Sequence, residues 1–238
     1  MTSLLSNDTS IHFYNEHAAE LAAHYLSIQF EAVHQAWLPH LQQIIQGSRS
    51  AYRIIDIGAG SGRDVKYLAE LSTDERPIEV YAVEPAQSLA EVGKALTSKV
   101  YSDLVKVAGA ASNTIKPVTW LEDKLPQLRK TQALNLKFDL ILLSAVWMHI
   151  DPSERCTALH SMAKLLTADG KIIITLRHGK SDDERVMHQV SIEELQVQSL
   201  RNGLSIIDHT ILEADKLGRN QVQWQTAILA RNETREIA

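Results

Sequence analysis

Apolar and polar positions follow two different periods along most of the chain, as is typical of folds in which strands and helices alternate. Short apolar runs predict buried strands at 52–57, 78–84, 118–121, 138–144 and 171–176, with two later strands at 204–212 and 221–230. Apolar residues spaced by three or four positions predict helices at 62–71, 85–98 and 191–202, and from a cap at Asp151 or Ser153 to residue 167. The alternation predicts an α/β fold with a mostly parallel sheet.

Three other segments carry weaker patterns. Residues 1–12 are predicted to form a mobile arm, and residues 15–46 to be helical, with a kink or a split at Pro39 and an end at Gly47. The segment 99–117 fits no single pattern and is longer than a simple connection needs. A turn at Asp169-Gly170 is expected to lead into the fifth strand.

Composition excludes some classes of protein. The formal charge of −5 over 238 residues argues against nucleic acid and anionic lipid as partners. The single cysteine, Cys156, cannot form an intramolecular disulfide. The N-terminus lacks the basic flank and apolar core of a signal peptide, and the apolar stretch at 140–148 is too short to span a bilayer. These features predict a cytoplasmic protein, either a monomer or a homodimer, that acts on a small molecule.

The stretch IIDIGAGSGRD, residues 54–64, places three glycines directly after a predicted buried strand. An ordinary tight turn is one explanation for Gly58, Gly60 and Gly62. A dinucleotide fingerprint, G-x-G-x-x-G, would need glycine at the position of Arg63. The observed G-x-G-x-G spacing instead fits a ligand whose polar end rests on the loop backbone.

The stretch VYAVEP places Glu84 at the end of the second predicted strand. A carboxylate at that place can accept hydrogen bonds from both hydroxyls of a ribose. The alternative is an acid that begins a helix, since Pro85 follows and acids favour the first turn. The glycine loop before it favours ribose binding.

Five motifs in this order resemble those of class I S-adenosylmethionine-dependent methyltransferases over roughly residues 50–230. They are IIDIGAGSGRD, VYAVEP, WLEDKLP, FDLILLSAVWMHI and LLTADGKIIITLRHG. The resemblance implies a Rossmann-like, doubly wound sheet of seven mostly parallel strands with an N-terminal helical lid. It further implies a division into an arm and lid helices at 1–48 and an S-adenosylmethionine-binding domain at 49–238.

The resemblance also implies roles for individual residues. Asp56 would reach the amino end of the cofactor, Arg63 its carboxylate, and Glu84 its ribose. The full set of residues implied to bind the cofactor is Tyr14, Asp56, Gly58, Ala59, Gly60, Arg63, Glu84, Pro85, Leu121, Glu122, Asp123, Ser144 and Ala145. Tyr14 belongs to the predicted lid, and the group at 121–123 would lie near the adenine.

The acceptor is expected beside the exits of the fourth and fifth strands, where Trp147, His149, Arg177, His178 and Arg185 are the candidate substrate-binding residues. Core packing is the alternative for Trp147, and a solvated loop for Arg177 and Arg185. His149 is a candidate general base or a helix cap. An arginine at a strand exit favours an acceptor with an acidic group.

The histidines lack the compact spacing of metal ligands, so no metal is predicted. A small-molecule methyltransferase is the leading function. Methylation of a protein or tRNA, a non-catalytic cofactor-binding module and a nucleotide-dependent oxidoreductase are the alternatives.

Overall fold

The computed structural model describes residues 2–47, 49–108, 114–181 and 183–232. In this part of the chain the strands form one sheet in the order β3-β2-β1-β4-β5-β8-β6, and the short β7 pairs with β8. The strands are β1 Tyr52–Ile57, β2 Ile78–Val83, β3 Thr119–Leu121, β4 Phe138–Leu143, β5 Leu166–His178, β6 Leu204–His209, β7 Glu213–Ala214 and β8 Gln223–Arg231. Only the pairs that involve β8 are antiparallel. The predicted Rossmann-like α/β fold is therefore confirmed.

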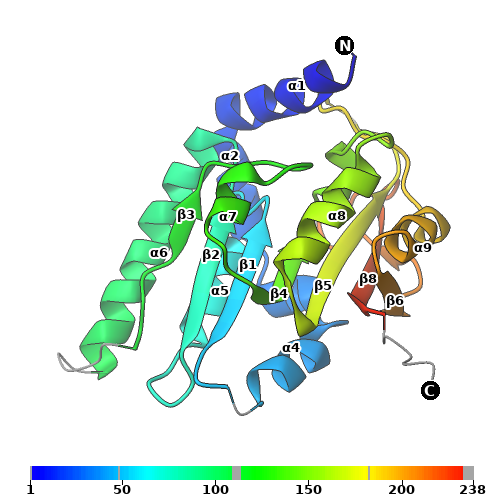
Figure 1. Cartoon of the computed structure of the whole chain (residues 1–238). Helices are drawn as coiled ribbons and strands as arrows, with labels where there is room; N and C mark the ends of the chain where they lie inside the picture. The colour runs from blue at the N-terminus through cyan, green and yellow to red at the C-terminus, as the bar shows by residue number, and fades with distance from the viewer. Residues whose placement is uncertain (1, 48, 109–113, 182, 233–238) are drawn as a thin grey trace, which may run out of the picture.

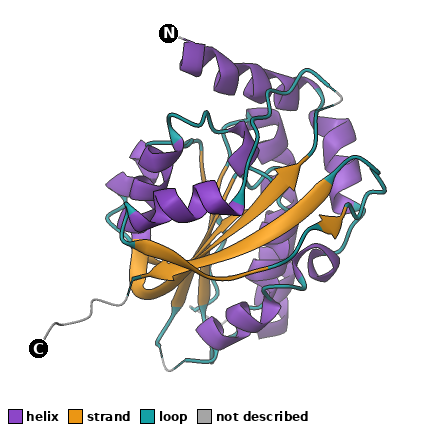
Figure 2. Cartoon of the chain, turned by 90° about the vertical axis from the view of Figure 1, so that its right-hand side faces the viewer, coloured by secondary structure: helices purple, strands orange, loops and turns teal. Residues whose placement is uncertain are grey.

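Helices cover both faces of this sheet, as the two views in Figures 1 and 2 show. They are α1 Thr2–Glu16, α2 Ala18–Leu26, α3 Phe30–His34, α4 Leu38–Ile45, α5 Arg63–Glu70, α6 Gln87–Ala108, α7 Arg129–Ala133, the 3₁₀ turn η1 Trp147–His149, α8 Arg155–Leu165 and α9 Ile192–Leu200. Leu159 of α8 and Leu195 of α9 belong to the core on one face. Leu41 of α4 and Leu68 of α5 belong to the core on the other.

The double coverage explains the unbroken apolar runs of the central strands. Successive side chains of a strand point to opposite faces. Ile55 and Ile141 enter one core, whereas Ile54 and Leu140 enter the other. Each of these residues is fully buried. A strand between two helical layers therefore needs apolar residues at both alternating positions.

The N-terminal segment differs from the prediction. A helix, α1, occupies the place of the mobile arm predicted at 1–12, although residue 1 lies outside the described residues. Its second half packs against α6 through Ile11 and Tyr14. This is a tertiary contact, which the residues around it in the sequence do not predict. The helix predicted at 15–46 is divided among the end of α1, α2, α3 and α4. Pro39 lies in the first turn of α4, where it leaves no hydrogen bond unmade, so it begins a helix rather than kinking one.

The ambiguous segment 99–117 is partly resolved by α6, which continues to Ala108 instead of ending at residue 98. Residues 109–113 lie outside the described part of the chain. Residues from 114 onward lead into β3.

The turn predicted at Asp169-Gly170 falls within the bounds of β5, at an irregular part of the strand. The pairing with β4 passes from Phe138–Leu166 directly to Leu140–Lys171, so Asp169 and Gly170 bulge out of the ladder before the regular pairing begins. Helix α8 follows Glu154, which provides no side-chain cap. Neither predicted capping residue is at the helix end; Asp151 instead accepts hydrogen bonds from the Ser153 backbone and hydroxyl.

Candidate active site

The glycine loop leaves β1 with a backbone that only glycine adopts readily. Gly58 and Gly60 have φ angles of 79° and 54°. A Cβ on Gly58 would lie 2.3 Å from Cγ2 of Val146, so the loop and the exit of β4 are in close contact there. A Cβ on Gly60 would meet nothing within 4 Å. The loop is thus packed on one side and open on the other, and the open side is available to a ligand.

Glu84 is held beneath this loop at the carboxyl end of β2. Its Oε2 accepts from the N–H of Gly60 at 2.7 Å, and its Oε1 accepts from the N–H of Ala86 at 2.7 Å. Burial raises the pKa of Glu84 to about 7, although both backbone donors oppose the rise. The carboxylate is therefore fixed in orientation and titrates near neutral pH.

Asp56 lies behind the loop, near the end of β1, and is 1% exposed. No described residue hydrogen-bonds its Oδ1. Burial raises the pKa of Asp56, and the nearby carboxylates of Asp64 and Glu84 raise it further. A buried carboxylate oxygen without a donor is costly, and a ligand ammonium would satisfy it. Asp56 lines neither of the two cavities described below, so its contact with the amino end of the cofactor stays a prediction.

The loop, Glu84 and helix α1 enclose a cavity of about 200 Å³ at the carboxyl ends of the strands. The predicted cofactor residues that line it are Tyr14, Gly58, Ala59, Gly60, Arg63, Glu84, Pro85, Asp123, Ser144 and Ala145. Leu121 and Glu122 do not line it. The carbonyl of Leu121 accepts from the N–H of Glu84, and Glu122 is exposed. We therefore do not include these two residues in the proposed adenine site.

Asp123 lines the cavity, but part of its carboxylate serves the fold. Its Oδ2 accepts from both the N–H and the hydroxyl of Thr131 at 2.8 Å, close to the start of α7. The loop after β3 is therefore anchored beside the cavity.

A second cavity, of about 130 Å³, adjoins the first. The residues that line both are Tyr14, Tyr25, Arg63, Ser144 and Ala145. Five cationic side chains line the second cavity, against two acidic ones, Glu213 and Asp215; the cations are Arg63, Arg177, Arg185, Lys216 and Arg219. Three of the cations are paired with a carboxylate: Arg63 with Asp64, Arg185 with Asp183 and Arg219 with Asp215. The remaining positive excess is small, and it favours an anionic ligand.

Arg177 and Arg185 both line this second cavity, as the sequence predicts. Arg177 is 5% exposed and donates to the carbonyls of Gly179 and Lys180 at 2.9 and 3.0 Å. These two bonds orient the guanidinium at the end of β5.

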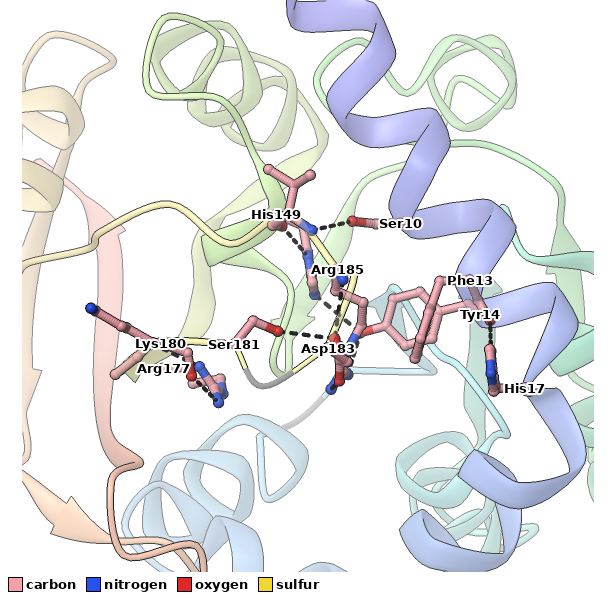
Figure 3. Close-up of polar contacts among 12 residues, drawn as sticks. Ser10, Phe13, Tyr14, His17, His149, Arg177, Lys180, Ser181, Asp183 and Arg185 are labelled. Carbon is pink, nitrogen blue, oxygen red and sulfur yellow. Dashed lines mark hydrogen bonds and ion pairs between the residues drawn. The ribbon is translucent and has the colours of Figure 1, made fainter.

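Arg185 is engaged more extensively, at the centre of the cluster in Figure 3. It binds Asp183 through Nε at 2.8 Å and through NH2 at 2.6 Å. Its NH1 donates to the hydroxyls of Tyr14 and Tyr25 at 3.2 and 3.4 Å, and its guanidinium lies over the rings of Phe13 and Tyr14. Arg185 thus joins the loop after β5 to helices α1 and α2.

His149 follows β4 and lines the first cavity beside Tyr14. The carbonyl of Val186 can only accept, so the 3.0 Å contact with Nδ1 places the ring proton on that nitrogen. Nε2 then accepts from the Tyr14 hydroxyl at 3.1 Å. Burial lowers the pKa of His149 to about 4, and the charges of Arg185 and Arg177 contribute. The imidazole is therefore neutral at pH 7.

Two predicted acceptor-binding residues line neither cavity. Trp147 is fully buried, and its side chain belongs to the hydrophobic core instead. His178 is the last residue of β5, and its side chain lies near Gln225 and Glu193, away from the second cavity. We therefore do not include Trp147 and His178 in the proposed acceptor site.

Sequence reasoning missed three residues that shape the site. Asp64 lines the first cavity and binds Arg63; its place in the first turn of α5 was the available signal. The Thr175 hydroxyl accepts from the N–H of Ala145 at 2.7 Å, which supports the positive φ of 59° at that residue. Tyr25 lies between the two cavities and was predicted only as part of a lid.

Within the described ranges, no group of three or more His, Cys, Asp or Glu side chains is arranged to hold a metal ion. None of the described helices has the length and apolar character needed to cross a membrane. Cytoplasmic location and oligomeric state stay predictions.

Comparison with known proteins identifies the family. The family model described as a methyltransferase domain matches residues 14–210. The curated proteins contain no significant match. Magnesium protoporphyrin IX methyltransferase from Synechocystis PCC 6803, solved with bound S-adenosylmethionine, is similar in structure at 15% identity, with a TM-score of 0.58 over 92% of this chain and 84% of that one.

Two further solved structures share the fold. One is 1,6-didemethyltoxoflavin-N1-methyltransferase from Burkholderia thailandensis, at 16% identity and a TM-score of 0.54 over 92% of this chain and 90% of that one. The other is the DhpI complex with S-adenosylhomocysteine, at 13% identity and a TM-score of 0.57 over 96% of this chain and 98% of that one. The family match covers most of the chain, and these solved structures hold S-adenosylmethionine or S-adenosylhomocysteine. The chain therefore belongs to the methyltransferase domain family and is a class I S-adenosylmethionine-dependent methyltransferase.

Proposed function

We propose that this enzyme methylates a small molecule that carries a carboxylate, bound in the second cavity. The observation that carries the proposal is the position of Arg177 on the wall of a cavity that adjoins the cofactor cavity. Arg177 is the proposed partner of the carboxylate, because it is buried at the end of β5 and directed by the Gly179 and Lys180 carbonyls. Arg185 is given a secondary role, since Asp183 and the two tyrosines already engage its nitrogens.

The cofactor roles proposed for the first cavity follow the charges of its residues. Asp56 accepts from the cofactor ammonium, and Arg63 pairs with the cofactor carboxylate. Glu84 accepts from the ribose hydroxyls with the lone pairs that Gly60 and Ala86 leave available. Asp123 lies on the side expected for the adenine.

S-adenosylmethionine supplies a methyl group that is already activated on a sulfonium. The task of the protein is therefore to align the two reactants in line and to exclude water. Ser144, Ala145 and Tyr14 line both cavities, so the proposed transfer takes place beside them. Helices α1 and α2 are the proposed lid, since Tyr14 and Tyr25 form part of the shared wall.

His149 is the proposed proton acceptor, acting through Tyr14. When the nucleophile carries a proton, that proton passes to the Tyr14 oxygen as the Tyr14 hydroxyl proton passes to Nε2 of His149. The existing hydrogen bond supports this direction. Because burial holds the pKa of His149 at about 4, the imidazole is a weak base and holds the proton only during the transfer.

Several methyltransferases of this fold are named for a small acceptor or were solved with one, including magnesium protoporphyrin IX, 1,6-didemethyltoxoflavin and phosphomonomethylethanolamine. These proteins share the fold with this chain, and they support a small molecule over a protein or tRNA as the acceptor.

The proposal is tested by measuring S-adenosylhomocysteine formation with a panel of small carboxylic acids and their neutral amides. Arg177→Met should raise KM for an accepted acid by about tenfold or more, the scale of one charge-assisted hydrogen bond, and leave the affinity for S-adenosylhomocysteine unchanged. Turnover of the amides that equals or exceeds that of the acids, or turnover confined to protein or tRNA, would contradict it.

A further inference from the structure

A buried chain of four side chains connects the N-terminal helices to the glycine loop. Trp37, which precedes α4, donates from Nε1 to Nδ1 of His34 at 2.9 Å. Nε2 of His34 lies 2.9 Å from Oδ2 of Asp64. Arg63 binds the same carboxylate through Nε at 2.6 Å and NH2 at 3.0 Å. Trp37 and His34 are fully buried, and Asp64 is 5% exposed.

The chemistry of Trp37 fixes the direction of each hydrogen bond. An indole N–H can only donate, so Nδ1 of His34 must accept. The imidazole proton is therefore on Nε2 and points at Asp64. The two bonds together fix which ring nitrogen accepts and which one donates.

Asp64 is in turn held as a carboxylate. Burial raises the pKa of Asp64, but the contacts with His34 and Arg63 outweigh it and hold the pKa well below its usual value. The carboxylate accepts from His34 on one side and from Arg63 on the other. A shift of His34 would therefore move the carboxylate that orients Arg63.

Arg63 is the last of these four hydrogen-bonded side chains, and it is the one that lies at the ligand cavities. Its side chain lines both cavities. The two bonds to Asp64 use the Nε edge of the guanidinium, so they fix the plane in which its other N–H groups point. The rotamer freedom of a long side chain is removed before the cofactor arrives, which strengthens binding.

We propose that His34, fixed by Trp37, is a positioning residue that acts through Asp64 to hold Arg63 in its cofactor-binding orientation. The proposal rests on the role given to Arg63 above, as partner of the cofactor carboxylate. It gives residues 34–37, which line neither cavity, a part in cofactor affinity.

The test is a double-mutant cycle on the affinity for S-adenosylhomocysteine, measured by calorimetry with His34→Leu, Arg63→Met and the double variant. His34→Leu should weaken binding about tenfold, the loss expected for one hydrogen bond to a charged group. In the Arg63→Met background the same change should alter the affinity less than about twofold, because the two residues act as one unit. His34→Gln, which keeps a donor for Asp64 and an acceptor for Trp37, should restore most of the affinity.

Phe30→Leu is the matched control. Phe30 lies in the same buried cluster, with its ring 4.5 Å from that of His34, and contributes packing only. It should lower the melting temperature without changing the affinity. Should His34→Leu fail to fold, Trp37→Phe takes its place in the cycle, because it removes the N–H that sets the tautomer.

The outcomes separate the two levels of the proposal. If Arg63→Met leaves the affinity unchanged, the role of Arg63 is wrong and the inference fails with it. If Arg63→Met weakens binding but the His34 change is silent, only the inference about His34 fails. It also fails if the His34 effect persists in the double variant, or if Phe30→Leu weakens binding equally.

Discussion

Cofactor affinity should depend on pH through Glu84. Burial raises the pKa of this carboxyl to about 7 in the ligand-free protein. Ribose hydroxyls donate to the ionised form, so binding favours loss of the proton and lowers the pKa. The affinity is therefore fully expressed above pH 7 and is lost as the pH falls below it. With a pKa of about 7, roughly nine-tenths of Glu84 is ionised at pH 8 and one-tenth at pH 6, which is a difference of about 1.4 kcal/mol in binding.

The assay is calorimetric titration with S-adenosylhomocysteine at pH 6, 7 and 8, in two buffers of different ionisation enthalpy. The dissociation constant should rise about tenfold from pH 8 to pH 6, with proton release on binding near and below pH 7. Glu84→Gln should bind more weakly at pH 8 and lose this dependence. Ligand ionisation is common to both proteins, so their difference isolates Glu84. Equal pH dependence in both proteins, or tighter binding at pH 6, would refute the reasoning.

Three other substitutions test the geometry of the site. Gly58→Ala should destabilise the fold by about 2 kcal/mol or more in chemical denaturation, because its Cβ would lie 2.3 Å from Val146 at a φ of 79°; a loss below 0.5 kcal/mol would argue against the contact. Gly60→Ala should cost only about 1 kcal/mol of stability but weaken S-adenosylhomocysteine binding, since its Cβ would enter the open side of the loop; unchanged affinity would place the ligand elsewhere. Arg185→Met removes the bond to Tyr14, so helix α1 should become more sensitive to limited proteolysis and the ligand should dissociate faster. Equal cleavage rates in the two proteins would show that this bond does not hold α1 in place.

The sheet and the cofactor loop were predictable from the sequence because their causes are local. A strand covered on both faces needs consecutive apolar residues, and 140–143 provides them. Gly58 and Gly60 could be recognised as loop residues because glycine adopts a positive φ more readily than any other residue. The order of these local signals along the chain was enough to indicate the family.

Tertiary contacts decided the rest. The residues around Arg185 in the sequence do not predict its contacts with Tyr14 and Tyr25, which come from the N-terminal helices. Trp147 follows the strand that ends at the site, but the turn η1 directs its side chain into the core. The role of His34 could not be predicted from the sequence, because its hydrogen-bond partner Asp64 lies in a different helix.

A crystal structure with S-adenosylhomocysteine would test the central claim most directly. We expect the ligand carboxylate on Arg63, the ribose hydroxyls on Glu84, and the sulfur facing the second cavity between Tyr14 and Ala145. A ligand whose sulfur faces away from that cavity, or one bound without contact to Glu84, would contradict the assignment of both cavities.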